Sequence, residues 1–171
     1  MKKLSLIAAA FALAGASAFA ATATDSFNVQ INFTGTCSVK TAAKDFSFTY
    51  TAFGAAQSDV GSTVFECSRG LTPTFSLNDN GGTMTGGSGV ALAGTLNGEG
   101  VISGVLYTIT ASPTRTQTGT AAAAGAGGTG GTIGTADEYT VDLTVDIPGL
   151  QAGSGTGPTT GTHTRVLTIT Y

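Results

Sequence analysis

The sequence predicts a single all-β domain of the β-sandwich type, and three observations lead to this prediction. Thr and Gly, with 31 and 26 copies, make up a third of the 171 residues, and these residue types favour strands and turns. Charged residues are only 10% of the chain, which is too few for a coiled coil or a long helical bundle. About seven short alternating segments, separated by turn signals, are typical of a sandwich.

The first 20 residues are expected to be a signal peptide that is cleaved after Ala20. Lys2 and Lys3 precede an apolar run that ends near Ala14 and is too short to span a bilayer, and Ala18-Phe19-Ala20 is an A-x-A cleavage site. Removal of the two lysines changes the net charge from −3 to −5. A basic face that binds nucleic acid is therefore not expected.

Export determines how the two cysteines are interpreted. In an oxidising compartment we expect Cys37 and Cys67 to form a disulfide. A metal pair or a reactive thiol are the alternatives, but the chain has a single histidine and no C-x-x-C motif. In the disputed chain-entropy model, such a cross-link stabilises the fold by about 3–4 kcal/mol.

The first predicted strand lies close to the mature N-terminus. Phe27, Val29, Ile31 and Phe33 alternate with polar residues, so one face of an extended segment is apolar. The pattern returns at Phe46, Phe48 and Tyr50, and a strand over residues 64–67 ends at Ser68-Arg69-Gly70.

The following strands are predicted from the same period of two. They cover residues 75–77, 105–109, 139–147 and 167–171. The clearest of them alternates from Tyr139 to Ile147 and stops at Pro148-Gly149, while Asn78 to Gly82 is a turn cluster after residues 75–77.

Two Gly-rich stretches fit no strand. Residues 83–100 have little apolar content, and residues 112–136 contain four consecutive alanines followed by five glycines in seven positions. Such a composition buries little apolar surface, so residues 112–136 are expected to be a mobile surface loop. With no internal repeat and no break in composition, residues 35–171 are expected to form one domain.

Catalytic and metal-binding groups are scarce, so we expect no enzyme activity, no cofactor and no metal. A Ser or Cys nucleophile needs a base, and the one imidazole, His163, is expected to be an exposed residue before the last strand. The carboxylates at Asp137, Glu138, Asp142 and Asp146 are expected to lie on a solvated outer face. Residues four positions apart on one strand are separated by roughly 13 Å, which is too far for them to bind the same metal ion. The turn at Asn78 lacks the acidic residue of a calcium loop.

The position of the segment 27–33 allows two interpretations. It can be the first strand of its own sandwich. It can also leave its own domain and complete a sheet edge in another subunit, with its alternating side chains in pockets of that subunit.

Several short motifs, in this order and spacing, resemble the spore coat protein U domain family of archaic chaperone–usher pilus subunits. After the alternating N-terminal segment they are Cys37-Ser38-Val39, Phe53-Gly54, Cys67 with Gly70, Phe75 to Leu77 with Gly81-Gly82, Leu106-Tyr107, Ile147 to Gln151, and Leu167 to Tyr171. The resemblance covers roughly residues 27–82 and 101–171. The chain departs from the family where Gly161 is followed by His163 and Arg165, since the family commonly has Gly-x-Tyr-x-Asp there. It also lacks the usual Arg-x-Met in the middle.

The resemblance implies an incomplete immunoglobulin-like β-sandwich that lacks one strand. A periplasmic chaperone would supply that strand until, at an outer-membrane usher, the N-terminal segment of the next subunit replaces it. Residues 21–34 would then be the donor segment, with Phe27, Val29, Ile31 and Phe33 as its inserting side chains. Leu167, Ile169 and Tyr171 of the last strand would border the acceptor groove.

The implied function is a secreted, non-enzymatic subunit of a surface pilus or coat. Its partners would be neighbouring copies of itself or related subunits, the chaperone and the usher. The alternative is a monomeric secreted β-sandwich that binds a ligand, as an adhesin does, although the absence of Trp argues against a sugar-binding platform. A secreted hydrolase is a third reading, disfavoured by the lack of a catalytic base.

Overall fold

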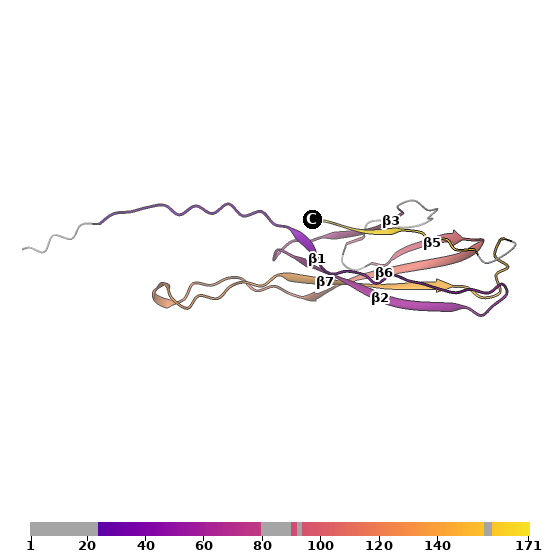
Figure 1. The fold of residues 1–171 in the computed structure, drawn as a ribbon. Helices are drawn as coiled ribbons and strands as arrows, with labels where there is room; N and C mark the ends of the chain where they lie inside the picture. The colour runs from indigo at the N-terminus through magenta and orange to yellow at the C-terminus, as the bar shows by residue number, and fades with distance from the viewer. Residues whose placement is uncertain (1–23, 80–89, 92–93, 156–158) are drawn as a thin grey trace, which may run out of the picture. The chain divides into compact units, whose positions relative to one another are not determined.

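The computed structural model describes residues 24–79, 90–91, 94–155 and 159–171, and they form two units divided between Phe33 and Thr34. The second unit is an all-β sandwich of two layers (Figure 1). Its strands are β1 (Cys37–Thr41), β2 (Gln57–Cys67), β3 (Thr74–Asp79), β4 (Val90–Ala91), β5 (Leu96–Ile102), β6 (Val105–Gln117), β7 (Asp137–Ile147) and β8 (Arg165–Thr170), with a short 3₁₀ turn, η1 (Ala126–Gly128).

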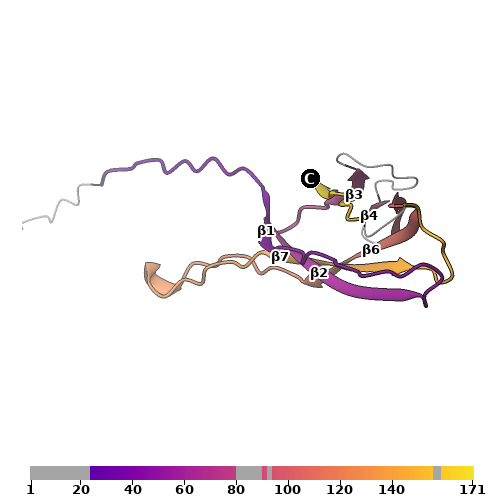
Figure 2. The ribbon, with the colours of Figure 1, turned by 45° about the vertical axis from the view of Figure 1, so that its right-hand side comes forward.

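Two antiparallel sheets make up the sandwich. The larger has the strand order β1-β2-β7-β6-β5, and the smaller has the order β4-β3-β8. Figure 2 shows β3, β4 and the end of β8 in one layer, with β2, β6 and β7 in the other. The predicted fold class, an all-β sandwich with one disulfide, is confirmed.

The core lies between these layers and is centred on β7. Its alternating residues from Tyr139 to Ile147 are buried, as the period of two requires, because β7 is flanked by β2 and β6. From the smaller sheet, Phe75 is fully buried, with its ring centroid 5.7 Å from that of Phe65 and 6.1 Å from that of Tyr139. Rings at these separations attract one another in edge-on or tilted arrangements.

The disulfide between Cys37 and Cys67 is present, and it joins the first strand to the core. The two cysteines are directly opposite in the antiparallel pair β1–β2. Since β1 has only five residues and four of them are exposed, the cross-link fixes a strand that buries little apolar surface of its own.

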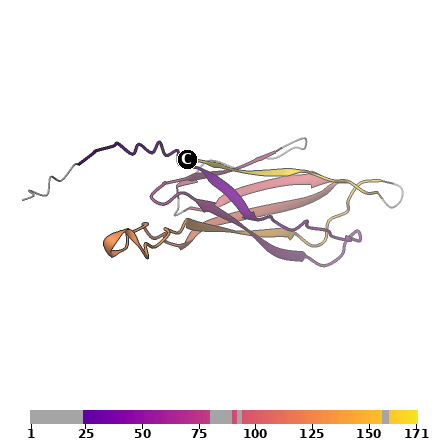
Figure 3. The same ribbon diagram turned by 60° about the vertical axis from the view of Figure 1, so that its left-hand side comes forward.

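Two predictions about loops are corrected by the structure. The expected loop 112–136 is shorter, because β6 continues to Gln117, and an isolated bridge joins Ala123 to Thr132. Figure 3 shows this hairpin extending beyond the sheets. The stretch 83–100 contains the start of β5, whose inward positions include Leu96, Gly98 and Gly100. Glycine fills two of these three positions, so most of the alternating apolar side chains that would predict a strand are missing.

Two further predictions need adjustment. Phe46, Phe48 and Tyr50 keep the predicted alternation, since all three are half-buried against the core, but residues 42–56 contain no strand. Asn78 and Asp79 of the predicted turn at residues 78–82 belong to β3 instead and pair with β8; residues 80–82 lie outside the described part.

Candidate functional site

The segment 27–33 has the alternation of apolar and polar residues that is typical of a strand, but it belongs to no strand in this structure. Phe27, Val29, Ile31 and Phe33 are 75–85% exposed, although they are the most apolar residues of their unit among those described. Among the described residues, β1 is the first strand of the larger sheet, and no strand includes residues 27–33. Four large apolar side chains exposed along one short segment are an unusual surface for a protein in water.

The last strand, β8, lies at an edge of the smaller sheet. Within the described residues it pairs with β3 alone, from Arg165 opposite Asp79 to Thr170 opposite Thr74. Leu167 and Ile169 point toward the core but are only half-buried, and Tyr171 follows the strand with 56% of its surface exposed. Thus β8 combines an open backbone edge with incompletely covered apolar side chains.

The first strand, β1, is the matching edge of the larger sheet, since it pairs only with β2 within the described residues. The chain that follows it carries the half-buried Phe46, Phe48 and Tyr50. In the three ribbon views, the end of β8 lies near the start of β1 (Figures 1 to 3). Incompletely covered apolar side chains therefore occur on both edges, and those after β1 were not predicted as part of a site.

The strand order identifies which strand would complete the sandwich. Immunoglobulin-type sandwiches place strands A, B, E and D in one sheet and C, F and G in the other. Here β1, β2, β7 and β6 follow the order A-B-E-D, while β3 and β8 occupy positions C and F. Position G would lie on the open side of β8, and no strand of the described residues fills it.

One end of the domain, where β7 ends, is closed by a clamp around Gln151. The Gln151 side chain accepts a hydrogen bond from the Leu106 amide at 2.6 Å and donates to the carbonyls of Leu106 and Pro148 at 2.9 and 2.8 Å. The Tyr50 hydroxyl accepts from the Gln151 amide at 2.9 Å and donates to the Gly54 carbonyl at 3.3 Å. Three of the sequence motifs, at Gly54, Leu106 and Gln151, thus meet in one network.

At the opposite end, next to the disulfide, Asp137 holds the start of β7. Its side chain is 1% exposed and accepts hydrogen bonds from the amides of Gly119 (2.5 Å) and Gly70 (2.9 Å) and from the Arg115 guanidinium (3.0 Å). Burial alone would raise the pKa of this carboxyl, but these donors, together with the charge of Arg69 nearby, lower it below its ordinary value. The expectation that Asp137 lies on a solvated face is wrong.

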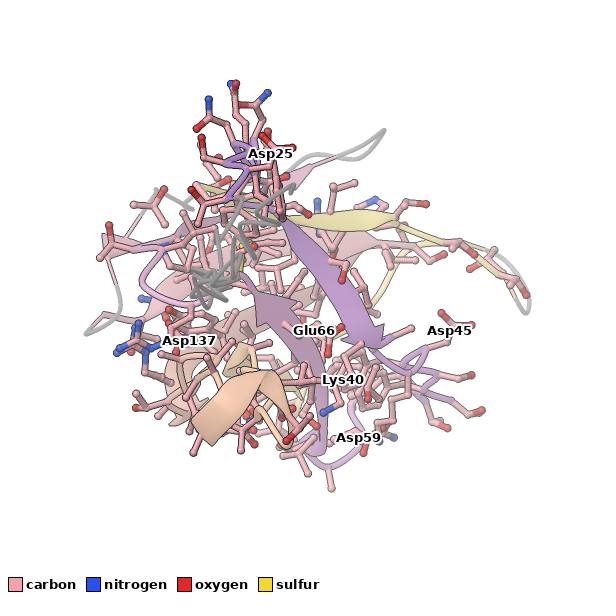
Figure 4. All side chains as sticks on the ribbon, turned by 90° about the vertical axis from the view of Figure 1, so that its left-hand side faces the viewer. Asp25, Lys40, Asp45, Asp59, Glu66 and Asp137 are labelled. Atoms are coloured by element: carbon pink, nitrogen blue, oxygen red, sulfur yellow. A yellow bond between two sulfur atoms is a disulfide. The ribbon has the colours of Figure 1, made fainter. Side chains whose placement is uncertain are left out.

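Asp142 is exposed, and Glu138 and Asp146 are half-exposed, on the outer face of β7, as expected from their spacing. Glu138 forms an ion pair with Lys40, whose pKa the hydrogen bond to Glu138 raises. Figure 4 looks onto the disulfide end of the domain and shows Lys40 and Glu66 apart from Asp137. Adjacent residues of β7 point to opposite faces, so Asp137 cannot join the outer carboxylates in a metal site.

His163 is half-buried rather than exposed, which corrects the expectation from sequence. Its Nδ1 lies 2.9 Å from the hydroxyl of Tyr107 and 3.3 Å from the Arg165 guanidinium, which also donates to Tyr107. Gly100 makes room for this group, because a Cβ there would lie 2.8 Å from the Tyr107 hydroxyl and would collide with the Arg165 side chain. The cluster connects β5, β6 and β8, since the Arg165 guanidinium also donates to the Glu99 carbonyl at 3.5 Å.

Across the described ranges, no three His, Cys, Asp or Glu side chains are placed to hold a metal ion. A hollow of about 470 Å³ over β2 and β7 includes one ionisable residue, Asp142, among Val60, Gly61, Ser62, Leu143 and Thr144. Within those same ranges no helix has the length and hydrophobicity to cross a membrane.

The comparisons with known proteins give one match. The sequence model of the Spore Coat Protein U domain matches residues 23–170, which is most of the chain and agrees with the resemblance seen in the motifs. No curated protein and no solved structure matches the chain.

Proposed function

The chain belongs to the Spore Coat Protein U domain family, and from this membership we propose that it is a secreted structural subunit of a surface pilus or coat. Neighbouring copies would be joined by donor-strand exchange, after a periplasmic chaperone and an outer-membrane usher have handled each subunit. The predicted signal peptide, residues 1–20, lies outside the described residues and would direct the chain to the periplasm.

One observation carries this proposal: the sandwich has strands in positions A to F, and the edge next to position G is open. The half-buried Leu167 and Ile169 on β8 would form one wall of an acceptor groove, with Tyr171 at its end. The half-buried Phe46, Phe48 and Tyr50 would line the other wall. An uncovered apolar groove beside an open strand edge invites aggregation unless another strand covers it.

The segment 27–33 has the properties that the groove requires of a donor. Its four large apolar side chains are exposed and follow a period of two, so a second copy can receive them on one face. Burial of four such side chains contributes about 6–12 kcal/mol before the cost of ordering the segment, at about 1.5–3 kcal/mol for each. Main-chain hydrogen bonds along β8 would add to this stabilisation.

A peptide-rescue experiment tests the proposal. Residues 35–171 would be expressed in an oxidising periplasm, and a synthetic peptide of residues 22–34 would be added while the melting temperature is followed. We expect a large, saturable rise, because the peptide fills position G. A stable domain that does not respond to the peptide would favour the self-contained binding module.

Two variant peptides provide matched controls. Ile31→Asp places a charge on the apolar face and should abolish the rise in melting temperature. Gln30→Asp adds the same charge to the polar face and should leave most of the rise intact. Equal effects of the two peptides would argue against insertion with alternating side chains. In the full chain, deletion of residues 21–34 should prevent fibre formation, and normal fibres from that deletion would contradict the proposal.

A further inference from the structure

Two exposed apolar residues occupy an unfavourable backbone conformation at the clamp end of the domain. Phe53 and Leu150 are 68% and 78% exposed, and their φ angles are 61° and 63°. Bulky residues are rare in this left-handed region, because it strains their backbone. Ser103 is the other non-glycine residue with positive φ in the described part of the chain, and it is small. Neither solvent exposure nor local geometry explains why these two positions hold large apolar side chains.

The two residues are held beside each other by main-chain hydrogen bonds. The Phe53 amide donates to the Gln151 carbonyl, and the Leu150 amide donates to the Gly54 carbonyl, both at 2.8 Å. The side chains of Gln151 and Tyr50 then fix these two loops to β6 and to each other. The main chain that carries the Phe53–Leu150 pair is therefore fixed, so little backbone entropy is lost when the pair binds a partner.

The direction of the missing strand shows what would lie next to this pair in a fibre, if the proposed function holds. A strand in position G runs antiparallel to β8, since both sheets of such a sandwich are antiparallel. β8 starts at Arg165, on the side where Tyr107 and Leu106 lie, and ends at Thr170, opposite Thr74 near the disulfide end. The N-terminal part of a donor segment would therefore lie at the disulfide end of the acceptor, and its Phe33 would lie at the clamp end.

The connection between the donor segment and its own domain is very short. The Thr36 amide donates to the Ser68 hydroxyl at 3.0 Å, and the Ser68 amide donates to the Thr36 carbonyl at 2.8 Å, so the domain is already fixed at Thr36. Only Thr34 and Gly35 separate that point from Phe33, so the Cα atoms of Phe33 and Thr36 lie at most about 11 Å apart. The disulfide end of the donor copy must then lie against the clamp end of the acceptor copy.

We infer that Phe53 and Leu150 form an apolar contact with the disulfide end of the next copy in the fibre. This inference rests on the proposed function and adds a second interface to it, separate from the groove. The donor strand would supply most of the binding energy, while the Phe53–Leu150 pair would fix the angle between successive copies. Large, rigid apolar residues at a subunit junction commonly contribute most to such a contact.

Photocrosslinking tests the contact directly. p-Benzoylphenylalanine would replace Phe53 in the full chain, which keeps an aromatic side chain at that position, and assembled fibres would be irradiated. We expect a product between two copies, with the linked peptide mapping to residues 34–37, 68–71 or 118–136 of the second copy. The same probe at Val60, which is 64% exposed on the outer face of β2, should give little of this product. Products from position 53 that map elsewhere, or none between copies, would overturn the inference.

A variant experiment separates this interface from the donor strand. Phe53→Asn with Leu150→Asn removes the apolar pair, and Asn tolerates the left-handed conformation. We expect fibres that form but dissociate at a temperature lower by at least several degrees, while the monomer melts no lower than wild type. Val60→Thr with Val101→Thr is the matched control and should dissociate like wild type.

Each outcome decides between the two claims. Fibres of the double Asn variant that dissociate at the wild-type temperature would overturn the inference alone, provided that Ile31→Asp still prevents assembly. Normal fibres from Ile31→Asp would overturn the donor-strand proposal and this inference with it. If the double Asn variant does not fold, Leu150→Gly alone gives the same comparison, because Gly adopts positive φ without strain.

Discussion

Two segments of this chain have the most regular alternation, and they have opposite environments. In β7, every apolar residue from Tyr139 to Ile147 is buried. In the segment 27–33, the corresponding four residues are at least 75% exposed. Alternation therefore predicts a strand with one apolar face, but it does not tell which core that face will enter. Partners decide this: β7 is hydrogen-bonded to β2 and β6, whereas the described residues 24–33 pair with no strand.

The largest expected effect comes from the same substitution made in both segments. Val141→Asp places a charge in the centre of the core, which costs about 4 kcal/mol or more, so the domain should not fold. Val29→Asp should leave the melting temperature of the monomer unchanged, because Val29 is 75% exposed. Thermal unfolding of the two variants by circular dichroism measures this difference.

Fibre formation is expected to be sensitive to the substitution in the segment 27–33, although that substitution leaves folding intact. Val29→Asp should abolish assembly if the segment inserts into a neighbour. The control is Asn28→Asp, which places the charge on the polar face and should assemble. A Val29→Asp chain that melts several degrees below wild type would show that the segment already contributes to its own domain, and the contrast with β7 would be lost.

The disulfide is expected to have the next largest effect, since β1 is intermediate between the two segments. It pairs with β2 but buries little, and the cross-link to Cys67 holds it at the edge. Replacement of both cysteines by serine should lower the free energy of unfolding by about 3–4 kcal/mol. Urea denaturation with and without a reductant checks this: reduction should destabilise the wild-type chain and leave the double serine variant unaffected.

The sequence predicts the strands with large inward side chains and misses those with small ones. β7 and β8 were predicted from Val, Leu and Ile at every second position, but β5 was missed because Gly98 and Gly100 take inward positions. Gly100 is there because Tyr107 and Arg165 fill the space that a side chain would need. That information lies in strands far along the chain, so no local pattern contains it.

In the candidate site, too, local patterns reveal some residues, and contacts between distant segments determine the others. The proposed donor residues, together with Leu167 and Ile169, are recognisable from alternation alone, and their proposed roles come from the family resemblance. The clamp around Gln151 and the buried environment of Asp137 depend on contacts between distant segments. Asp137 directly precedes the outward-facing Glu138, and its residue type gives no sign that it is buried, although its odd position along the alternating strand is compatible with an inward direction.

Asp137 gives a prediction of intermediate size, at the first residue of the buried strand. Asp137→Asn should lower the free energy of unfolding by about 2–3 kcal/mol at neutral pH, since hydrogen bonds to a charged group are lost or weakened. The pKa of this carboxyl is lower in the folded chain than in the unfolded chain. Its contribution is therefore complete above the ordinary Asp pKa and is lost as the pH falls through the lower, folded value.

Stability measured by urea denaturation at several pH values distinguishes this role. The wild-type chain should lose more stability than Asp137→Asn when the pH is lowered from neutral to about 3, below the ordinary carboxyl pKa. Asp142→Asn is the matched control, because this residue lies exposed on the same strand. Parallel pH curves for wild type and Asp137→Asn would mean that the charge of Asp137 is not what holds Gly70 and Gly119.

The smallest effect is expected from the hairpin between β6 and β7, which has neither alternation nor a buried face. Its base is fixed, since the Thr135 amide donates to the Thr120 carbonyl at 3.0 Å and Gly119 bonds to Asp137. Beyond that base, residues 121–133 are exposed apart from one half-buried glycine, and Ile133 is 92% exposed. Replacement of residues 121–133 by Asn-Gly should therefore change the free energy of unfolding by about 1 kcal/mol or less, because shortening a loop changes its closure entropy only slowly. Thermal unfolding measures the change, and a much larger loss would reveal that these residues pack against the domain more firmly than their exposure indicates.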